Sequence, residues 1–129
     1  MDKLLLDTYA LVEITRGSDK GRRALAEIKR ASSVYTGSLN LYELWYVVAG
    51  ESGGKAAERT VLAIQNLAKT VPADDDISLI AAKLKLAHSG GKIGAVDFIT
   101  AAAAMSLDAT ILTGDPHYPQ IPEAKTKML

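Results

Sequence analysis

The sequence contains no cysteine, so disulfide bonds and thiolate metal sites are excluded, and we expect a reducing, cytoplasmic location. It also lacks an excess of either charge, since fifteen Lys and Arg residues balance fifteen Asp and Glu residues. This balance argues against binding nucleic acid through overall charge, although a local basic patch is compatible with it. No apolar run is long enough to span a membrane, and the opening MDKLLLD is not a signal-peptide pattern.

What is present is typical of one globular domain, 1–129, with 48% hydrophobic and 23% charged residues. Short apolar runs, which we interpret as strands, alternate with segments of helical periodicity. The predicted strands are 3–6, 33–36, 70–73, 109–112 and a last one within 123–129. The predicted helices are 8–16, 19–31, 39–49, 55–69, one starting at 74–76, and 98–107. This alternation predicts an α/β domain whose parallel sheet is covered by helices on both faces.

Four acids follow strands or open helices in this pattern. In the segment GAVDFITAAAAMSLDATILTGDPHY, Asp97 precedes an apolar helix and Asp115 follows the next strand. Asp7 ends the first strand, and Glu43 lies early in the helix 39–49. In a parallel α/β sheet all four positions belong to the carboxyl edge of the strands, where ligands bind. Four carboxylates crowded there would repel one another unless a cation neutralised them, and oxygen ligands without cysteine favour Mg²⁺ or Mn²⁺ over zinc.

Each acid also has a purely structural interpretation. Asp7 suits the N-cap of the helix that follows it. Glu43 has the spacing of a capping box with Asn40. Asp97 suits a helix start, and Asp115 before a proline suits a turn. Neither histidine is predicted to be a metal ligand, and Trp45 is expected in the core or in a dimer face, together with Tyr46.

Three segments, LLLDTYALVE, SLNLYELWYVV and IGAVDFITAAAAMSLDATILTGDPHY, resemble the PIN domain, and more narrowly the PIN toxins of VapBC toxin–antitoxin pairs. The resemblance implies a three-layer α/β/α fold with a five-stranded parallel sheet. It also implies a Mg²⁺- or Mn²⁺-dependent endoribonuclease whose metal-binding, catalytic acids are Asp7, Glu43, Asp97 and Asp115. Thr113 matches the family's hydroxyl residue before the last acid, and Thr8 and Ser38 occupy supporting positions. Family members generally form homodimers, and the toxins bind an antitoxin protein.

The chain departs from the family pattern at two positions. Tyr9 stands where many members carry Asn, which removes a polar contact, and Asp115 stands where Asn is usual, which adds a carboxylate. Contact with the RNA substrate is expected from cations, although such charges are more often plain solvated surface. The candidate RNA-binding residues are Arg16, Lys20, Arg22, Arg23 and Lys92.

Other functions compete with the toxin interpretation. A PIN nuclease of RNA maturation and a catalytically idle RNA- or protein-binding PIN domain would share this fold. The complete set of four acids favours an active enzyme over the idle domain. A phosphoryl-transfer fold of the haloacid dehalogenase kind needs a second Asp two residues after the first, where this chain has Tyr9. A response regulator needs paired acids at the first strand and a lysine after the last, and neither is found.

Overall fold

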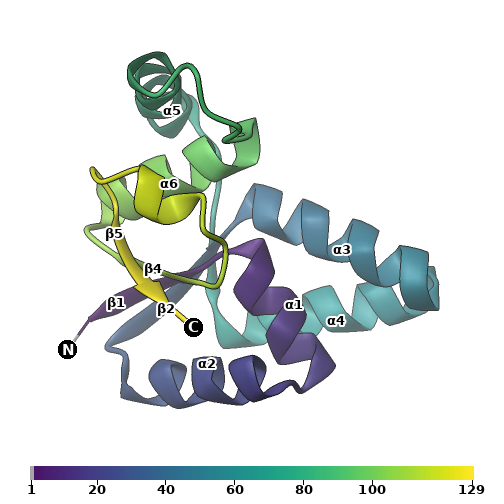
Figure 1. Cartoon of the computed structure of the whole chain (residues 1–129). Helices are drawn as coiled ribbons and strands as arrows, with labels where there is room; N and C mark the ends of the chain where they lie inside the picture. The colour runs from purple at the N-terminus through teal and green to yellow at the C-terminus, as the bar shows by residue number, and fades with distance from the viewer. Residues whose placement is uncertain (1) are drawn as a thin grey trace.

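The structure is a computed structural model, in which residues 2–129 are described (Figure 1). Its five strands are β1 (Lys3–Leu6), β2 (Ser33–Gly37), β3 (Lys69–Val71), β4 (Thr110–Thr113) and β5 (Lys125–Met128). Its helices are α1 (Thr8–Arg16), α2 (Asp19–Arg30), α3 (Ser38–Ser52), α4 (Gly54–Leu67), α5 (Asp75–Ala87), α6 (Ala95–Leu107) and the short 3₁₀ helix η1 (Tyr118–Gln120). Across these residues, no helix is long and apolar enough to cross a membrane.

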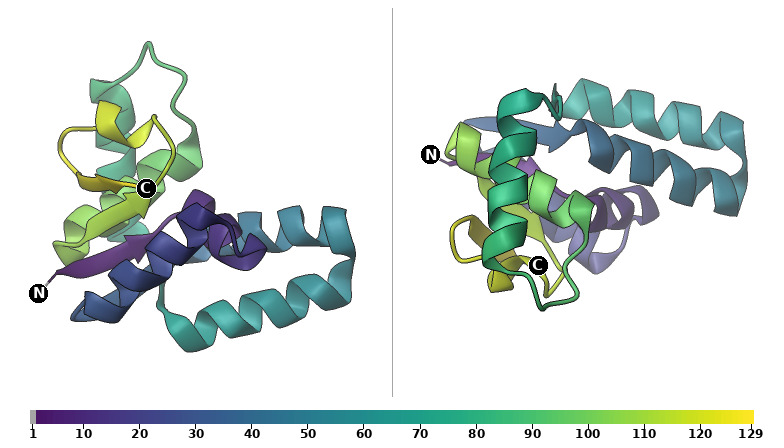
Figure 2. Two further views of the ribbon diagram at one scale, coloured as in Figure 1. Left: turned by 60° about the horizontal axis from the view of Figure 1, so that its bottom comes forward. Right: turned by 90° about the horizontal axis from the view of Figure 1, so that it is seen from above.

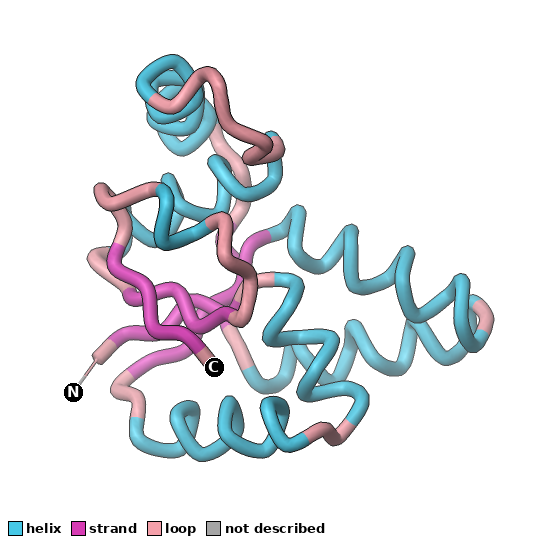
Figure 3. Tube along the Cα trace, viewed as in Figure 1, coloured by secondary structure: helices cyan, strands magenta, loops and turns pink. Residues whose placement is uncertain are grey.

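The strands form one parallel sheet in the order β3-β2-β1-β4-β5, seen as the magenta centre of Figure 3. β1 is central, and its Leu6 pairs with Thr36 of β2 and Leu112 of β4. Successive side chains of a strand point to opposite faces, so Leu4 and Leu6 enter one core while Leu5 enters another. Burial on both sides of the sheet explains why the central strands β1 and β4 are mostly apolar, whereas the edge strand β5 carries exposed Lys125 and Lys127.

Helices cover both faces of the sheet, which gives three layers and confirms the predicted three-layer α/β/α fold. α5, α6 and η1 close one core, in which the alanines of α6 let it lie close to Leu5 and Ile111. α1, α2, α3 and α4 close the other core around Leu6 and Leu112. In Figure 1, α5 and α6 lie above the sheet, α2 lies below it, and α1, α3 and α4 lie to its right.

α3 and α4 form a hairpin that projects away from the sheet, as both views of Figure 2 show. Gly53, with φ 88°, makes the turn between them in the left-handed region. The projecting part has no sheet to cover, so Tyr42, Trp45 and Tyr46 are exposed. The expectation that Trp45 and Tyr46 pack in the core is therefore wrong, while their role in a dimer face stays a prediction.

The start of α3 also corrects the sequence interpretation. The helix begins at Ser38, and the backbone N–H of Gly37 donates to Asn40 Oδ1 at 3.1 Å. Asn40 therefore closes the box with Gly37, and the predicted capping box of Asn40 with Glu43 is wrong. Because the helix starts earlier than the periodicity suggested, Glu43 falls in its second turn.

Candidate active site

Asp7 directly follows β1 and is almost completely buried, with 2% of the residue exposed. One carboxylate oxygen, Oδ1, accepts the N–H of Ala10 at 2.9 Å, so the residue is the N-cap of α1 as its structural interpretation predicted. The other oxygen, Oδ2, accepts a hydrogen bond from Thr113 Oγ1 at the end of β4. Asp7 is thus held in one orientation by two neighbouring elements.

Thr113 joins Asp7 to Asp115. While its hydroxyl donates to Asp7, the same oxygen accepts the backbone N–H of Asp115 at 2.9 Å. Asp115 in turn accepts the N–H of His117 on Oδ1 at 2.9 Å, which makes it the turn opener that Asp-Pro suggested. The buried hydroxyl of Thr113 therefore sets the position of both acids.

Asp97 lies in the first turn of α6 and reaches the same place from the other side of the sheet edge. Its Oδ2 accepts the N–H of Gly94 at 3.3 Å. His117 Nδ1 lies 3.3 Å from this oxygen and 3.4 Å from Asp115 Oδ1. One ligand atom from each of these three residues lies within 4.8 Å of the others, which is compatible with a shared metal ion.

His117 was not predicted to belong to the site. The sequence places His117 two residues after Asp115 in the same turn, which could have suggested a role in the site. This spacing alone does not predict the direction of the imidazole ring. The structure directs the ring between the carboxylates of Asp97 and Asp115.

The electrostatics of the site show a shortage of positive charge. Burial raises the pKa of Asp7 from 3.8 to about 7, and the negative charges of Asp115 and Asp97 add to the shift, against the hydrogen bonds from Thr113 and Ala10. Burial and the same three acids also raise the pKa of Tyr118, whose hydroxyl is hydrogen-bonded to Thr100. A divalent cation would relieve this charge. The donors suit Mg²⁺ or Mn²⁺, because they are mainly carboxylate oxygens.

Glu43 is connected to this cluster indirectly. Its Oε1 accepts the hydroxyl of Thr8, next in the chain to Asp7, at 2.5 Å. Asn40 Nδ2 donates to Thr8 Oγ1 at 3.2 Å and to Thr100 Oγ1 at 3.1 Å. Asp97, Asp115 and His117 are the three residues whose ligand atoms lie within 4.8 Å of one another, and neither Glu43 nor Asp7 belongs to this group. Asn40, fully buried, is a positioning residue that the sequence pattern did not reveal.

The other predicted residues lie in different surroundings. Ser38 accepts the N–H of Ala73 and so supports the connection between β3 and α5. Arg16 pairs with Glu51 at 2.6 Å, at the far end of α1 and about 13 Å along the helix from Asp7. Arg22 pairs with Asp19. Arg23 and Lys92 are exposed, and no contact to the acids is described for them.

Lys20 differs from the other predicted cations because it contacts Tyr9, a side chain that packs beside Asp115. Its Nζ donates to the hydroxyl of Tyr9 at 2.7 Å. The ring of Tyr9 lies against Gly114, where an added Cβ would meet the ring carbons at 2.2–2.9 Å. Gly114 is therefore required by close packing, and it immediately precedes Asp115.

Gly114→Ala is expected to lower the free energy of unfolding by about 1–3 kcal/mol, because the new methyl group overlaps the Tyr9 ring. Tyr9→Ala removes that ring, so the double variant should lose clearly less than the sum of the two single variants. Urea unfolding of the four proteins measures the coupling. Additive losses would show that the glycine is needed for another reason.

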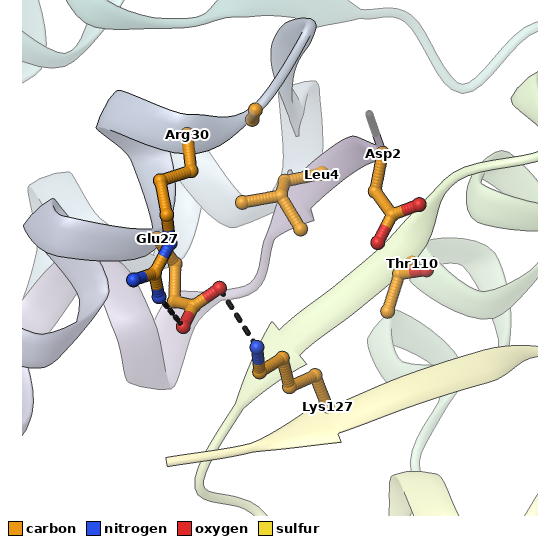
Figure 4. A pocket seen from close by; sticks show the side chains of 7 residues that line it. Asp2, Leu4, Glu27, Arg30, Thr110 and Lys127 are labelled. Carbon is orange, nitrogen blue, oxygen red and sulfur yellow. Dashed lines mark hydrogen bonds and ion pairs between the residues drawn. The ribbon is translucent and has the colours of Figure 1, made fainter.

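A polar pocket lies at the opposite end of the strands, near the start of β1 and β4 (Figure 4). Glu27 of α2 accepts hydrogen bonds there from Arg30 and, at 2.8 Å, from Lys127 of β5. The hydrogen bond from Lys127 helps hold the pKa of Glu27 below its usual value. The Glu27 carboxylate thus bridges two cations and ties α2 to the edge strand β5, at the end of the sheet opposite to the acid cluster.

The sequence model of the PIN domain matches residues 4–124. The chain belongs to the PIN domain family. This result confirms the resemblance and covers all four predicted acids. No curated protein shows significant sequence similarity to this PIN domain.

Solved structures share its fold. VapBC2 from Rickettsia felis, bound to a promoter DNA fragment, has a TM-score of 0.82 at 19% identity over 98% of both chains. VapC20 from Mycobacterium tuberculosis, described as a toxin that cleaves the sarcin–ricin loop, has a TM-score of 0.76 at 16% identity over 91% of this chain and 93% of that one. FitAcB from Neisseria gonorrhoeae has a TM-score of 0.74 at 25% identity over 95% of both chains.

Proposed function

We propose that this PIN domain is a Mg²⁺- or Mn²⁺-dependent endoribonuclease and the toxin of a type II toxin–antitoxin pair. The observation that carries the proposal is the meeting of Asp7, Asp97 and Asp115 at one sheet edge, with the pKa of Asp7 raised to about 7. Such a shift is typical of a site built for a cation or for proton transfer. Family membership and the VapBC structures of the same fold support the toxin assignment.

In this proposal Asp97 and Asp115 hold the metal ion, with Asp7 below them and Glu43 contributing through water. A bound divalent cation supplies a water of lowered pKa and neutralises charge on the phosphodiester. Asp97 and Asp115 are only half-buried, so they face the substrate, whereas Asp7 is sealed beneath them. Thr113 and the N–H of Ala10 keep the Asp7 carboxylate aligned.

Proton transfer in this scheme uses Asp97 as the base, since its second oxygen is not engaged by Gly94. His117 Nδ1 lies 3.3 Å from Asp97 Oδ2 and 3.4 Å from Asp115 Oδ1, so its ring helps to hold the two carboxylates beside each other. Cleavage by water attack in line leaves a 5′-phosphate and a 3′-hydroxyl.

We further propose a homodimer and an antitoxin partner. The exposed aromatic side chains of α3, Tyr42, Trp45 and Tyr46, support a protein contact on the hairpin, because surfaces of this kind are usually covered. A PIN nuclease of RNA maturation remains the second candidate. A neighbouring gene for a small DNA-binding protein favours the toxin, and its absence favours RNA maturation.

The test is cleavage of a labelled RNA panel by the wild-type protein with Mg²⁺, with Mn²⁺ or with EDTA. We expect cleavage only with metal, and the Asp97→Asn variant, prepared in parallel, reveals any contaminating nuclease. Calorimetric titration with Mn²⁺ should show binding to the wild type and much weaker binding to Asp97→Asn. Folded protein that neither binds metal nor cleaves any RNA would refute the proposed function.

A further inference from the structure

Lys20 contacts Tyr9, whose ring lies against Gly114, the residue before Asp115. We propose that its ammonium group binds a phosphate of the RNA backbone next to the cleaved bond, and that Tyr9 positions it there. This inference rests on the proposed ribonuclease function and names the part of the site that holds the substrate.

Two short contacts connect the Lys20 side chain to the backbone that precedes Asp115. The Tyr9 ring presses on Gly114, the residue before Asp115, and the Tyr9 hydroxyl accepts a hydrogen bond from Lys20 Nζ at 2.7 Å. Nζ also lies 5.2 Å from the centre of the Tyr9 ring. The ammonium is thus one aromatic ring away from the backbone that carries Asp115.

The charge of Lys20 is not neutralised by a carboxylate. Among residues 2–129, no acid lies within ion-pair distance of its Nζ, whereas Arg16 and Arg22 both have such partners. Tyr9 offers only a neutral oxygen and occupies one of the three N–H donors of the ammonium. The remaining donors and the full charge are available to an anion.

Helix stability does not explain a lysine at this position. Lys20 lies in the first turn of α2, where a cation opposes the helix dipole and costs a few tenths of a kcal/mol. Tyr9, which accepts the hydrogen bond from Lys20, packs closely on Gly114 of a separate segment. Beside a cluster of carboxylates, an RNA chain needs a positive contact of this kind to offset repulsion of its phosphates.

The test compares three variants with the wild type in steady-state cleavage with Mg²⁺, using the RNA that the panel identifies. Lys20→Gln removes the charge, Tyr9→Phe removes only the hydroxyl, and Lys29→Gln is the matched control, because Lys29 is an exposed lysine at the other end of α2. The salt dependence of kcat/KM is measured for each protein. Calorimetric Mn²⁺ titration without RNA reports on the acid cluster itself.

We expect Lys20→Gln to raise KM about 5–10-fold with kcat within twofold, and to make the slope of log(kcat/KM) against log salt shallower by about 0.7, as for one lost phosphate contact on a single strand. Tyr9→Phe keeps the charge, so KM should rise about 2–3-fold with the slope unchanged. Lys29→Gln should match the wild type. Mn²⁺ affinity should be the same in all four proteins.

The outcomes separate this inference from the proposed function. Absence of cleavage by wild-type protein overturns the function, and the inference with it. Normal wild-type cleavage, with Lys20→Gln indistinguishable from Lys29→Gln, overturns the inference alone. A change of Mn²⁺ affinity in Lys20→Gln, without a change in the salt slope, would show that Lys20 balances the acids and does not bind RNA.

Discussion

Asp7→Asn is expected to lower the rate of metal-dependent RNA cleavage by about 10³-fold, because it removes one charge from the group of acids that would bind the cation. Asn is as good an N-cap as Asp, so α1 keeps the bond to the N–H of Ala10. The loss of activity therefore does not require a loss of structure. Single-turnover cleavage, with circular dichroism of the same samples, measures both.

Asp108→Asn is the matched control for this change. Asp108 is exposed, ends α6 in a left-handed conformation that Asn tolerates, and pairs with Lys125 at the surface. The control should cleave RNA at the wild-type rate. Full activity of Asp7→Asn would contradict the proposed role of Asp7.

The same substitution is expected to stabilise the metal-free protein at pH 8. The pKa of Asp7 is about 7 in the folded protein, compared with an ordinary value of 3.8. The folded state therefore binds the proton more tightly than the unfolded state does. Folding is therefore most favourable below about pH 4, and this contribution is lost as the pH rises to about 7. Above pH 7 the buried charge costs on the order of 4 kcal/mol, which Asn does not carry.

In EDTA at pH 8, we expect Asp7→Asn to melt about 10 °C above the wild type, with the difference disappearing toward pH 4. Added Mn²⁺ should raise the melting temperature of the wild type and have little effect on the variant. Thermal unfolding at four pH values, with and without metal, measures this. Equal melting temperatures at pH 8 in EDTA would mean that the Asp7 charge is already compensated.

The fold was predictable because local signals agree with one another along most of the chain. The run 3–6 and the helix 8–16 have the predicted limits, since an apolar run ends at an acid that also caps the next helix. Helix starts were less certain where glycine is the N-cap, as before α3 and α6, because glycine has no side chain to mark the position. The 3₁₀ helix η1 was not predicted, because its Pro119 is equally compatible with a turn.

The site was only partly accessible from the sequence. The positions of Asp7, Asp97 and Asp115 follow from the rule that strand ends and helix starts share one edge of a parallel sheet. Contacts between distant segments cannot be predicted from the spacing of residues in the sequence. They determine the packing of Tyr9 on Gly114, the ring orientation of His117 and the hydrogen bonds of Asn40. The exposure of Trp45 was missed because periodicity marks an apolar side of a helix without showing whether anything covers it.

The pairing of Leu6 with Leu112 has a consequence for the chemistry. Asp7 and Thr113 are the next residues along the chain after these two leucines, so their hydrogen bond depends on the register of β1 and β4. A slip by one residue would shift the strands by about 3.3 Å and turn one side chain to the opposite face. The apolar centre of the protein thus sets the spacing of Asp7 and Thr113, and repacking it is expected to weaken the proposed metal binding before the protein unfolds.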